Sequence, residues 1–284
     1  MMKLSNNDYL NMFISAKDIE GCSSKTLKYY KDIILKFIRH IEKPIKEITT
    51  DDIRLYFAEY KNTHACGTAT MDNIRRVFSS FFAWLEDEDY ILKSPVRRIH
   101  RVKSITAVKE AFSDENIEVL RDNCKTIREL ALLELLLSTG MRVGELVNLN
   151  ISDMNFEDRS CIVLGKGNKQ REVYFDARTK LHLKEYLATR TDDNEALFVS
   201  NIKPHQRLTI STIEYLMRVL GKKANIKKVH PHRCRRTVAT VAIDKGMPIE
   251  QVQKLLGHTK IDTTLHYAMV NQTNDKFSHR KYIG

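Results

Sequence analysis

The chain has 284 residues, enough for about two domains, and its 42% hydrophobic fraction is that of a protein that fills buried cores. Its 47 lysines and arginines outnumber its 36 aspartates and glutamates, and this excess favours a nucleic acid over a membrane as partner. The most apolar run, residues 130–137, is too short to cross a bilayer and contains Glu134, so we expect no membrane partner.

Residues 1–92 show the period of amphipathic helices. Apolar residues recur at steps of three and four along residues 27–41 and again along residues 71–85. Residues 49–60 open with threonines and acids that suit a helix start, and residues 5–15 suggest one more helix. We therefore predict an N-terminal domain of four helices.

Residues 93–109 are predicted to form a basic linker. The segment 91–109 carries six lysines and arginines, no acid, and Pro95, and it shows no clear period. A solvated linker and a linker that follows DNA phosphates both fit this composition.

Residues 110–284 are predicted to form an α+β domain. Residues 127–140 are apolar on nearly all sides, which indicates a central buried helix that ends at Gly140. Residues 160–175 contain two β-rich runs around a Gly-Asn pair, which is typical of an antiparallel hairpin. Further helical patterns follow at about 177–189, 209–221, 233–245 and 249–256. The whole chain is thus expected to be mainly α with a small antiparallel sheet.

Two candidate site segments lie early in this second domain. Arg142 follows the Gly140 break and precedes Glu145 by three positions, a spacing that a surface ion pair would also explain. Lys166 and Lys169 flank the predicted hairpin tip, which lacks the spacing of a P-loop. A solvated turn is the simpler interpretation of these lysines alone, and the functional alternative is a mobile ammonium that reaches a DNA phosphate and gives up a proton. Sequence period does not separate Lys166 from Lys169.

The segment HPHRCRRTVAT indicates an anion site. Pro231 suits a helix start, and His232 and Arg235 then share one face of that helix. Two cations at the positive end of a helix are unfavourable unless an anion binds there, so we expect a phosphate. A metal held by His230, His232 and Cys234 is disfavoured because positions i and i+2 do not converge on a helix.

Tyr267 is the candidate nucleophile. It lies nine residues after His258, which directly follows the predicted helix stop Gly257. A phenol has a pKa of about 10 and needs help to react at neutral pH, so a packing tyrosine is the simpler interpretation of Tyr267 alone. Attack on a phosphodiester adds negative charge, which paired arginine donors can bind while histidine and lysine move protons.

The candidate residues together supply every role in such a reaction. They are Arg142, Lys166, His232, Arg235, His258 and Tyr267. No carboxylate cluster suited to Mg²⁺ accompanies them, so a two-metal nuclease is disfavoured and no cofactor is expected.

These motifs resemble the tyrosine recombinase, or phage integrase, family, and the whole chain is similar to its short, two-domain Xer-type members. The motifs are TGMRVGEL with Arg142, GKGNKQR with Lys166, HPHRCRRTVAT with His232 and Arg235, LLGH with His258, and TTLHY with Tyr267. The resemblance implies that residues 1–92 are a core-binding domain and residues 110–284 a catalytic domain with a C-terminal tail. It also selects Lys166 over Lys169. Arg236 and Cys234 depart from the histidine and leucine common in the family.

The resemblance implies a site-specific recombinase that cleaves and rejoins DNA through a 3′-phosphotyrosyl intermediate, in integration, excision or resolution. Arg142 and Arg235 would hold the phosphate with His258 beside them, Lys166 would protonate the leaving 5′-oxygen, and His232 would handle the tyrosine proton. Double-stranded DNA is the expected partner, bound by a homotetramer that is a monomer when free in solution. Further DNA contacts are expected from Arg97, Arg98, Arg101, Lys103, Lys169, Arg171 and Arg236.

Two other functions remain open at this point. A type IB topoisomerase uses the same tyrosine chemistry in a monomer that relaxes supercoils. A sequence-specific DNA-binding accessory protein would use the helical domain and the basic linker while Tyr267 stays inert.

The cysteines indicate the compartment. Five are scattered along the chain without a C-x-x-C pair: Cys22, Cys66, Cys124, Cys161 and Cys234. The first residues also lack the pattern of a signal peptide. We therefore expect reduced thiols in a cytoplasmic protein.

Overall fold

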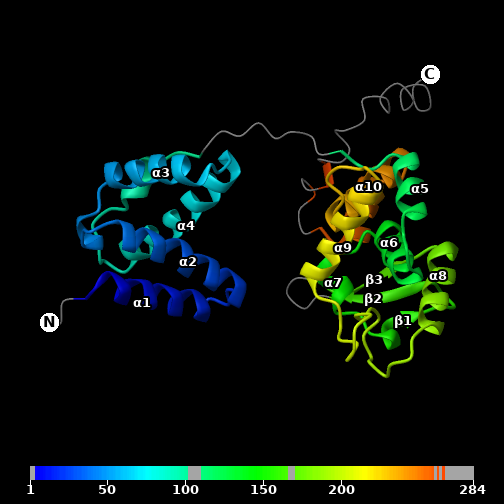
Figure 1. The fold of residues 1–284 in the computed structure, drawn as a ribbon. Helices are drawn as coiled ribbons and strands as arrows, with labels where there is room; N and C mark the ends of the chain where they lie inside the picture. The colour runs from blue at the N-terminus through cyan, green and yellow to red at the C-terminus, as the bar shows by residue number, and fades with distance from the viewer. Residues whose placement is uncertain (1–3, 102–109, 166–169, 259–260, 262–263, 266–284) are drawn as a thin grey trace, which may run out of the picture. The chain divides into compact units, whose positions relative to one another are not determined.

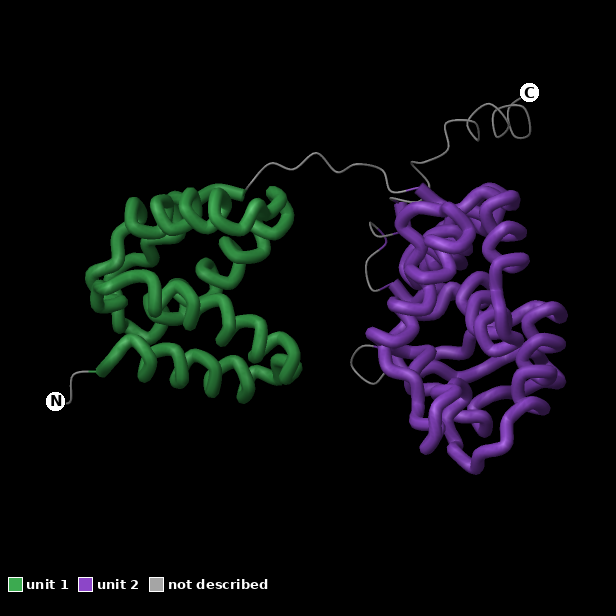
Figure 2. The backbone as a smooth tube through the Cα atoms, in the orientation of Figure 1, with its two compact units in different colours: residues 1–106 green, residues 107–284 purple. Residues whose placement is uncertain are grey.

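The computed structural model describes residues 4–101, 110–165, 170–258, 261 and 264–265. The chain divides into two compact units, Met1–Thr106 and Ala107–Gly284 (Figure 2). Both are built mainly of helices (Figure 1). Within the described part, no helix is both long and apolar enough to cross a membrane.

Unit 1 contains the four predicted helices. They are α1 (Asn6–Ile19), α2 (Ser24–His40), α3 (Thr50–His64) and α4 (Thr68–Asp87), with short 3₁₀ turns at Ile45–Glu47 and Pro95–Arg98. Side chains cap the helix starts: the hydroxyls of Ser5 and Thr49 each accept a hydrogen bond from the backbone N–H three residues on. The apolar stripes face inward and form an aromatic core, in which the ring centroids of Phe37 and Phe78 lie 4.8 Å apart.

The first residues of the predicted basic linker pack onto unit 1. Val96 is buried, and the hydroxyl of Thr50 donates to the carbonyl of Pro95 at 2.8 Å. The backbone N–H of Ser94 donates to the carboxylate of Glu86 at 3.0 Å. Residues 94–98 therefore belong to the fold of unit 1, while residues 102–109 lie outside the described residues.

Unit 2 contains helices around one small sheet, as predicted. The helices are α5 (Asp114–Asp122), α6 (Ile127–Thr139), α7 (Val143–Val147), α8 (Ala177–Ala188), α9 (Ile210–Lys223), α10 (Pro231–Asp244) and α11 (Ile249–Leu256), with a 3₁₀ turn at Ile151–Asp153. The sheet has the order β1 (Met154–Asn155), β2 (Ser160–Leu164) and β3 (Gln170–Tyr174), all antiparallel. Cys161 pairs with Val173 in the hairpin, whose tip, residues 166–169, lies outside the described residues.

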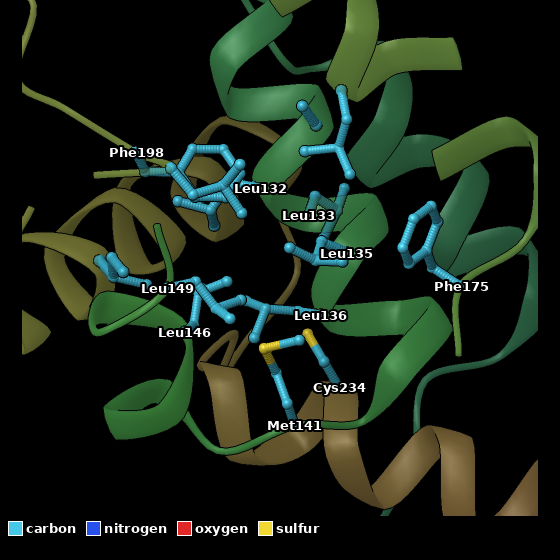
Figure 3. Packing of buried hydrophobic residues seen from close by; sticks show 14 of the residues in the cluster. Leu132, Leu133, Leu135, Leu136, Met141, Leu146, Leu149, Phe175, Phe198 and Cys234 are labelled. Atoms are coloured by element: carbon cyan, nitrogen blue, oxygen red, sulfur yellow. The ribbon is translucent and has the colours of Figure 1, made fainter. Parts of the chain in front are cut away.

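Helix α6 is the centre of unit 2. Leu132, Leu133, Leu135 and Leu136 are buried, and α8 and α10 pack against the helix. Figure 3 shows Met141, Cys234 and Leu136 in one buried cluster, which agrees with the packing of α10 against α6.

Gly140 ends α6 in the left-handed conformation, with φ of 60°. A Cβ at this position would lie only 2.8 Å from a methyl group of Leu256 in α11. The close approach brings the ends of α6 and α11 together, and the predicted site is built there.

Candidate active site

Three arginines donate hydrogen bonds to three consecutive carbonyls at the end of α11. Helix ends leave such carbonyls without partners inside the helix, and they carry the negative end of the helix dipole, so they attract cations. Gly257, with φ of 65°, ends the helix and opens these carbonyls to neighbours. The pairs are Arg171 Nε to Leu255 O (3.3 Å), Arg235 Nη2 to Leu256 O (2.6 Å) and Arg142 Nη2 to Gly257 O (2.8 Å).

Arg235 links two helix ends. It lies in the second turn of α10, is only 1% exposed, and also donates from Nη1 to the carbonyl of Gly140 at 2.8 Å. A buried guanidinium is stable only when its donors are satisfied, and the carbonyls at the ends of α6 and α11 provide acceptors. The α6–α11 approach therefore fixes the position of Arg235.

Arg142 is held by Glu145 at the start of α7. The carboxylate of Glu145 accepts from the backbone N–H of Arg142 at 2.7 Å and from its Nη1 at 2.8 Å. Arg171, on β3, donates to both oxygens of the same carboxylate, at 2.6 and 2.8 Å. Burial raises the pKa of Glu145, but the hydrogen bonds from Arg171 and Arg142 and the charge of Arg171 outweigh it and lower the pKa overall.

His258 lies beside this group of arginines. Burial and then the positive charges of Arg235, Arg142, His232 and Arg171 lower its pKa to about 4, so the imidazole is neutral at pH 7. Its Nδ1 lies 2.9 Å from the hydroxyl of the fully buried Thr264. His258 is therefore oriented by a side chain six residues further along the chain.

The predicted residues Arg142, His232 and Arg235 line one hollow of about 530 Å³, which exceeds the size of a phosphate group. Pro231 at the start of α10 and Gly165, directly after β2, also line it. Gly165 directly precedes the predicted Lys166 in the sequence. The hollow is therefore positively charged, because the start of α10 and the side chains of Arg142, Arg235 and His232 all line it, and this charge suits an anion.

Several predicted site residues lie outside the described residues: Tyr267, Lys166, Lys169 and Lys103. Their roles stay predictions. The metal interpretation of His230, His232 and Cys234 finds no support, because Cys234 is in the core and the ring of His230 caps α10. Within the described part of the chain, no group of three or more possible ligands is arranged to hold a metal ion.

The predicted DNA-contacting arginines divide into two groups. Arg97, Arg98 and Arg101 are exposed on unit 1, where Arg97 pairs with Glu86 at 2.6 Å. Arg171 and Arg236 instead face inward: Arg236 is buried and donates to the carbonyl of Glu110 at 2.8 Å. Their contact with DNA stays a prediction, and the structure gives both a place inside the protein.

Sequence reasoning missed two features of the site. Glu145 was recognised only as a possible surface partner of Arg142, whereas it is buried and serves two arginines. Thr264 was not singled out, although it lies in the quoted TTLHY motif and contacts His258. The available signal was Gly257 followed directly by His258 after an apolar helix, which indicates a turn that contains His258.

Comparison with known proteins agrees with this arrangement. Residues 110–274 match the model of the phage integrase family, and residues 9–92 match that of the phage integrase N-terminal SAM-like domain. Tyrosine recombinase XerC of Staphylococcus aureus (strain USA300 / TCH1516) is 30% identical over 278 residues, which cover 93% of each chain.

Solved structures give the same result for the fold. The crystal structure of XerA recombinase has 30% sequence identity and a TM-score of 0.57, over 99% of each chain. XerH recombinase, bound to its palindromic difH substrate, has 21% identity and a TM-score of 0.76, over 99% of this chain and 85% of that one. The chain therefore belongs to the phage integrase family, as its motifs predicted.

Proposed function

We propose that the chain is a site-specific DNA recombinase that cleaves and rejoins DNA strands through a 3′-phosphotyrosyl intermediate. The observation that carries this proposal is the hollow lined by Arg142, His232 and Arg235, with His258 beside it. Paired guanidiniums there match the non-bridging oxygens of a phosphodiester. A relative of similar length is a tyrosine recombinase, which supports the same reaction class.

In the proposed reaction, the phenol oxygen of Tyr267 attacks the scissile phosphorus. A bond forms between that oxygen and the 3′-phosphate, the bond to the 5′-oxygen breaks, and a 5′-hydroxyl leaves. His232 takes the phenol proton, and Lys166 gives a proton to the leaving oxygen. Because the phosphotyrosyl ester conserves the phosphodiester bond, the 5′-hydroxyl of another strand can reverse the step without a cofactor.

Arg142, Arg235 and His258 would stabilise the charge that develops during attack. The two arginines are already hydrogen-bonded to the end of α11, so little reorganisation is needed when the phosphate arrives. A neutral His258 has one N–H. If the Thr264 hydroxyl donates to Nδ1, that N–H is on Nε2 and can donate to a phosphate oxygen.

Duplex DNA is the proposed partner. The net charge of +11 and the exposed Arg97, Arg98 and Arg101 support it, and the related XerH recombinase was solved on a DNA substrate. We assign DNA binding to residues 1–92 and strand cleavage to residues 110–284. Residues 93–109 are the basic segment between them, of which residues 94–98 fold with unit 1. Exchange between two duplexes would need four copies of the chain, assembled from free monomers.

The test uses a duplex that the wild-type chain selects from a randomised pool, nicked beside the cleaved position so that the covalent product accumulates. Tyr267→Phe is expected to bind this duplex normally and to form no covalent protein–DNA band. A wild-type chain that binds but never forms the band would instead indicate an accessory DNA-binding protein. A monomer that relaxes supercoiled plasmid would indicate the topoisomerase alternative.

A further inference from the structure

We propose that Arg171 is a positioning residue for strand cleavage, which acts through Glu145 on Arg142 and through the end of α11 on His258. The inference rests on the proposed function and adds to it a residue outside the six predicted for the reaction. It also gives Arg171 a different role from the DNA contact that its basic neighbourhood suggested.

The first observation is the shared carboxylate. Arg171 Nη1 and Nη2 bind the two oxygens of Glu145 as a fork, at 2.6 and 2.8 Å. The same two oxygens accept from Arg142, so the orientation of Arg142 depends on a carboxylate that Arg171 fixes. The Glu145 side chain is 3% exposed, so water does not compete strongly for it.

The second observation is the balance of charge. One carboxylate faces two guanidiniums, so a positive excess remains beside the hollow. Without Arg171, Glu145 would pair with Arg142 alone and offset the charge that Arg142 offers to a phosphate. Arg171 therefore keeps Arg142 both oriented and effectively positive.

The third observation is the contact with α11. Arg171 Nε donates to the carbonyl of Leu255, and its Cδ lies 3.0 Å from the place that a Cβ on Gly257 would occupy. His258 is the next residue, and the charge of Arg171 contributes to lowering its pKa. Arg171 thus contacts the turn from which His258 projects.

The fourth observation is the position of Arg171 on the hairpin. It lies in β3 opposite Val163 of β2, two residues after the hairpin tip that contains Lys166. A single side chain therefore connects the hairpin, the start of α7 and the end of α11. Its side chain is 15% exposed, all three guanidinium nitrogens bind the protein, and it is absent from the described residues that line the hollow. These facts favour positioning over direct contact with DNA.

The experiment compares Arg171→Gln with a matched control, Arg121→Gln. Arg121 binds both oxygens of buried Glu134 at 2.7 and 3.0 Å and is 19% exposed, but it lies in α5, away from the described residues of the site. Folding is followed by thermal unfolding, binding by gel mobility, and cleavage by the rate of covalent band formation on the selected nicked duplex at saturating protein.

We expect Arg171→Gln to slow band formation about 100-fold while binding changes less than about threefold. Arg171→Lys retains the charge but not the fork, so it should recover part of the rate. Arg121→Gln should lose comparable stability and cleave at the wild-type rate per folded molecule. A methylphosphonate at the cleaved position removes one charged oxygen, so it should shrink the Arg171→Gln defect and leave the control unchanged.

Three results would overturn the inference while leaving the proposed function intact. They are wild-type cleavage by folded Arg171→Gln, equal defects in Arg171→Gln and Arg121→Gln, and a loss of binding as large as the loss of cleavage. If Arg171→Gln does not fold, Arg171→Lys is tested in the same assay. Lysine cannot form the fork to Glu145, so cleavage at the wild-type rate by Arg171→Lys would refute the positioning role. A wild-type chain without a covalent band would overturn the proposed function and this inference together.

Discussion

Among the described residues of unit 2, two buried carboxylates, Glu134 and Glu145, bind arginine forks, and they differ in their surroundings. Glu134 in α6 pairs with Arg121, and near them Arg178 faces Glu118, so the charges of this cluster balance. Glu145 at the start of α7 binds two arginines, Arg142 and Arg171, and both of them donate to carbonyls at the end of α11, as Arg235 does. Only the second cluster adjoins the hollow and has an excess of positive charge.

The comparison shows that a buried ion pair alone does not mark an active site. The Arg121–Glu134 pair stabilises the fold. The Glu145 pairs have similar geometry, but they orient Arg142 towards a site that suits an anion. The distinguishing features are the charge excess and the helix-end carbonyls that orient it.

The largest effect is expected for Arg235→Lys. Lysine keeps the charge but cannot bind two carbonyls and a phosphate oxygen in one plane, so cleavage of the nicked duplex should fall about a thousandfold. Binding, measured on the same duplex, should weaken less than about tenfold, because the lost contacts strengthen in the transition state. Arg121→Lys at the balanced cluster is the control. Equal losses of cleavage and binding would make Arg235 a simple DNA-binding residue.

The next effect separates the two carboxylates. Glu145→Gln leaves Arg142 and Arg171 without their shared countercharge, and Glu134→Gln leaves Arg121 with only the exposed Glu118 as partner, so each should lower the unfolding free energy by about 3 kcal/mol. Chemical denaturation measures this loss. Only Glu145→Gln should also slow covalent band formation under conditions in which both variants are folded. Slow cleavage by folded Glu134→Gln would contradict the comparison.

A smaller effect concerns pH. The pKa of His258 is about 4 in the folded chain and close to 6.5 when unfolded, so between these values only the unfolded state binds the proton. The contribution of His258 to the unfolding free energy is fully present above pH 6.5. It is lost as the pH falls towards 4, and it amounts to about 2 kcal/mol once the partial exposure of the ring is allowed for. Denaturation across this range should show a shallower loss in His258→Asn. Equal slopes in both proteins would refute the prediction.

The smallest effect is expected in unit 1. Buried Asp72 in α4 pairs with Arg75 at 2.9 Å and with the exposed Arg76 at 3.0 Å. Because Arg76 is solvated and Arg75 stays paired, Arg76→Ala should change the unfolding free energy by less than about 0.5 kcal/mol. Chemical denaturation of the whole chain measures it. A loss as large as that in Glu134→Gln would mean that exposure does not distinguish these pairs.

Local sequence signals predicted most of the fold. The apolar runs of α2, α4 and α6, the stop at Gly140 and the two strands β2 and β3 each depend on neighbouring residues, and the structure confirms them, while the Gly-Asn pair between the strands lies outside the described residues. The short strand β1 was not predicted, because two residues leave no period to detect.

The candidate site was predicted from motifs rather than from local pattern. Arg142, His232 and Arg235 do line one hollow, although they lie up to 93 residues apart in the sequence. The pair of Arg171 and Glu145 spans 26 residues and connects a strand with a helix start, so no helical or strand period reveals it. For the same reason the inward orientation of Arg171 and Arg236 was not apparent from their basic neighbourhood.

The end of α11 has a consequence for which changes the chain can tolerate. The three groups there that accept hydrogen bonds from arginines are backbone carbonyls, so substitutions on the exposed face of α11 leave these carbonyls in place. Deleting one residue from the helix would instead turn that carbonyl row by about 100° about the helix axis. Natural variants should therefore vary freely in the exposed side chains of α11 while keeping its length, so that insertions and deletions, rather than substitutions, are the changes this helix excludes.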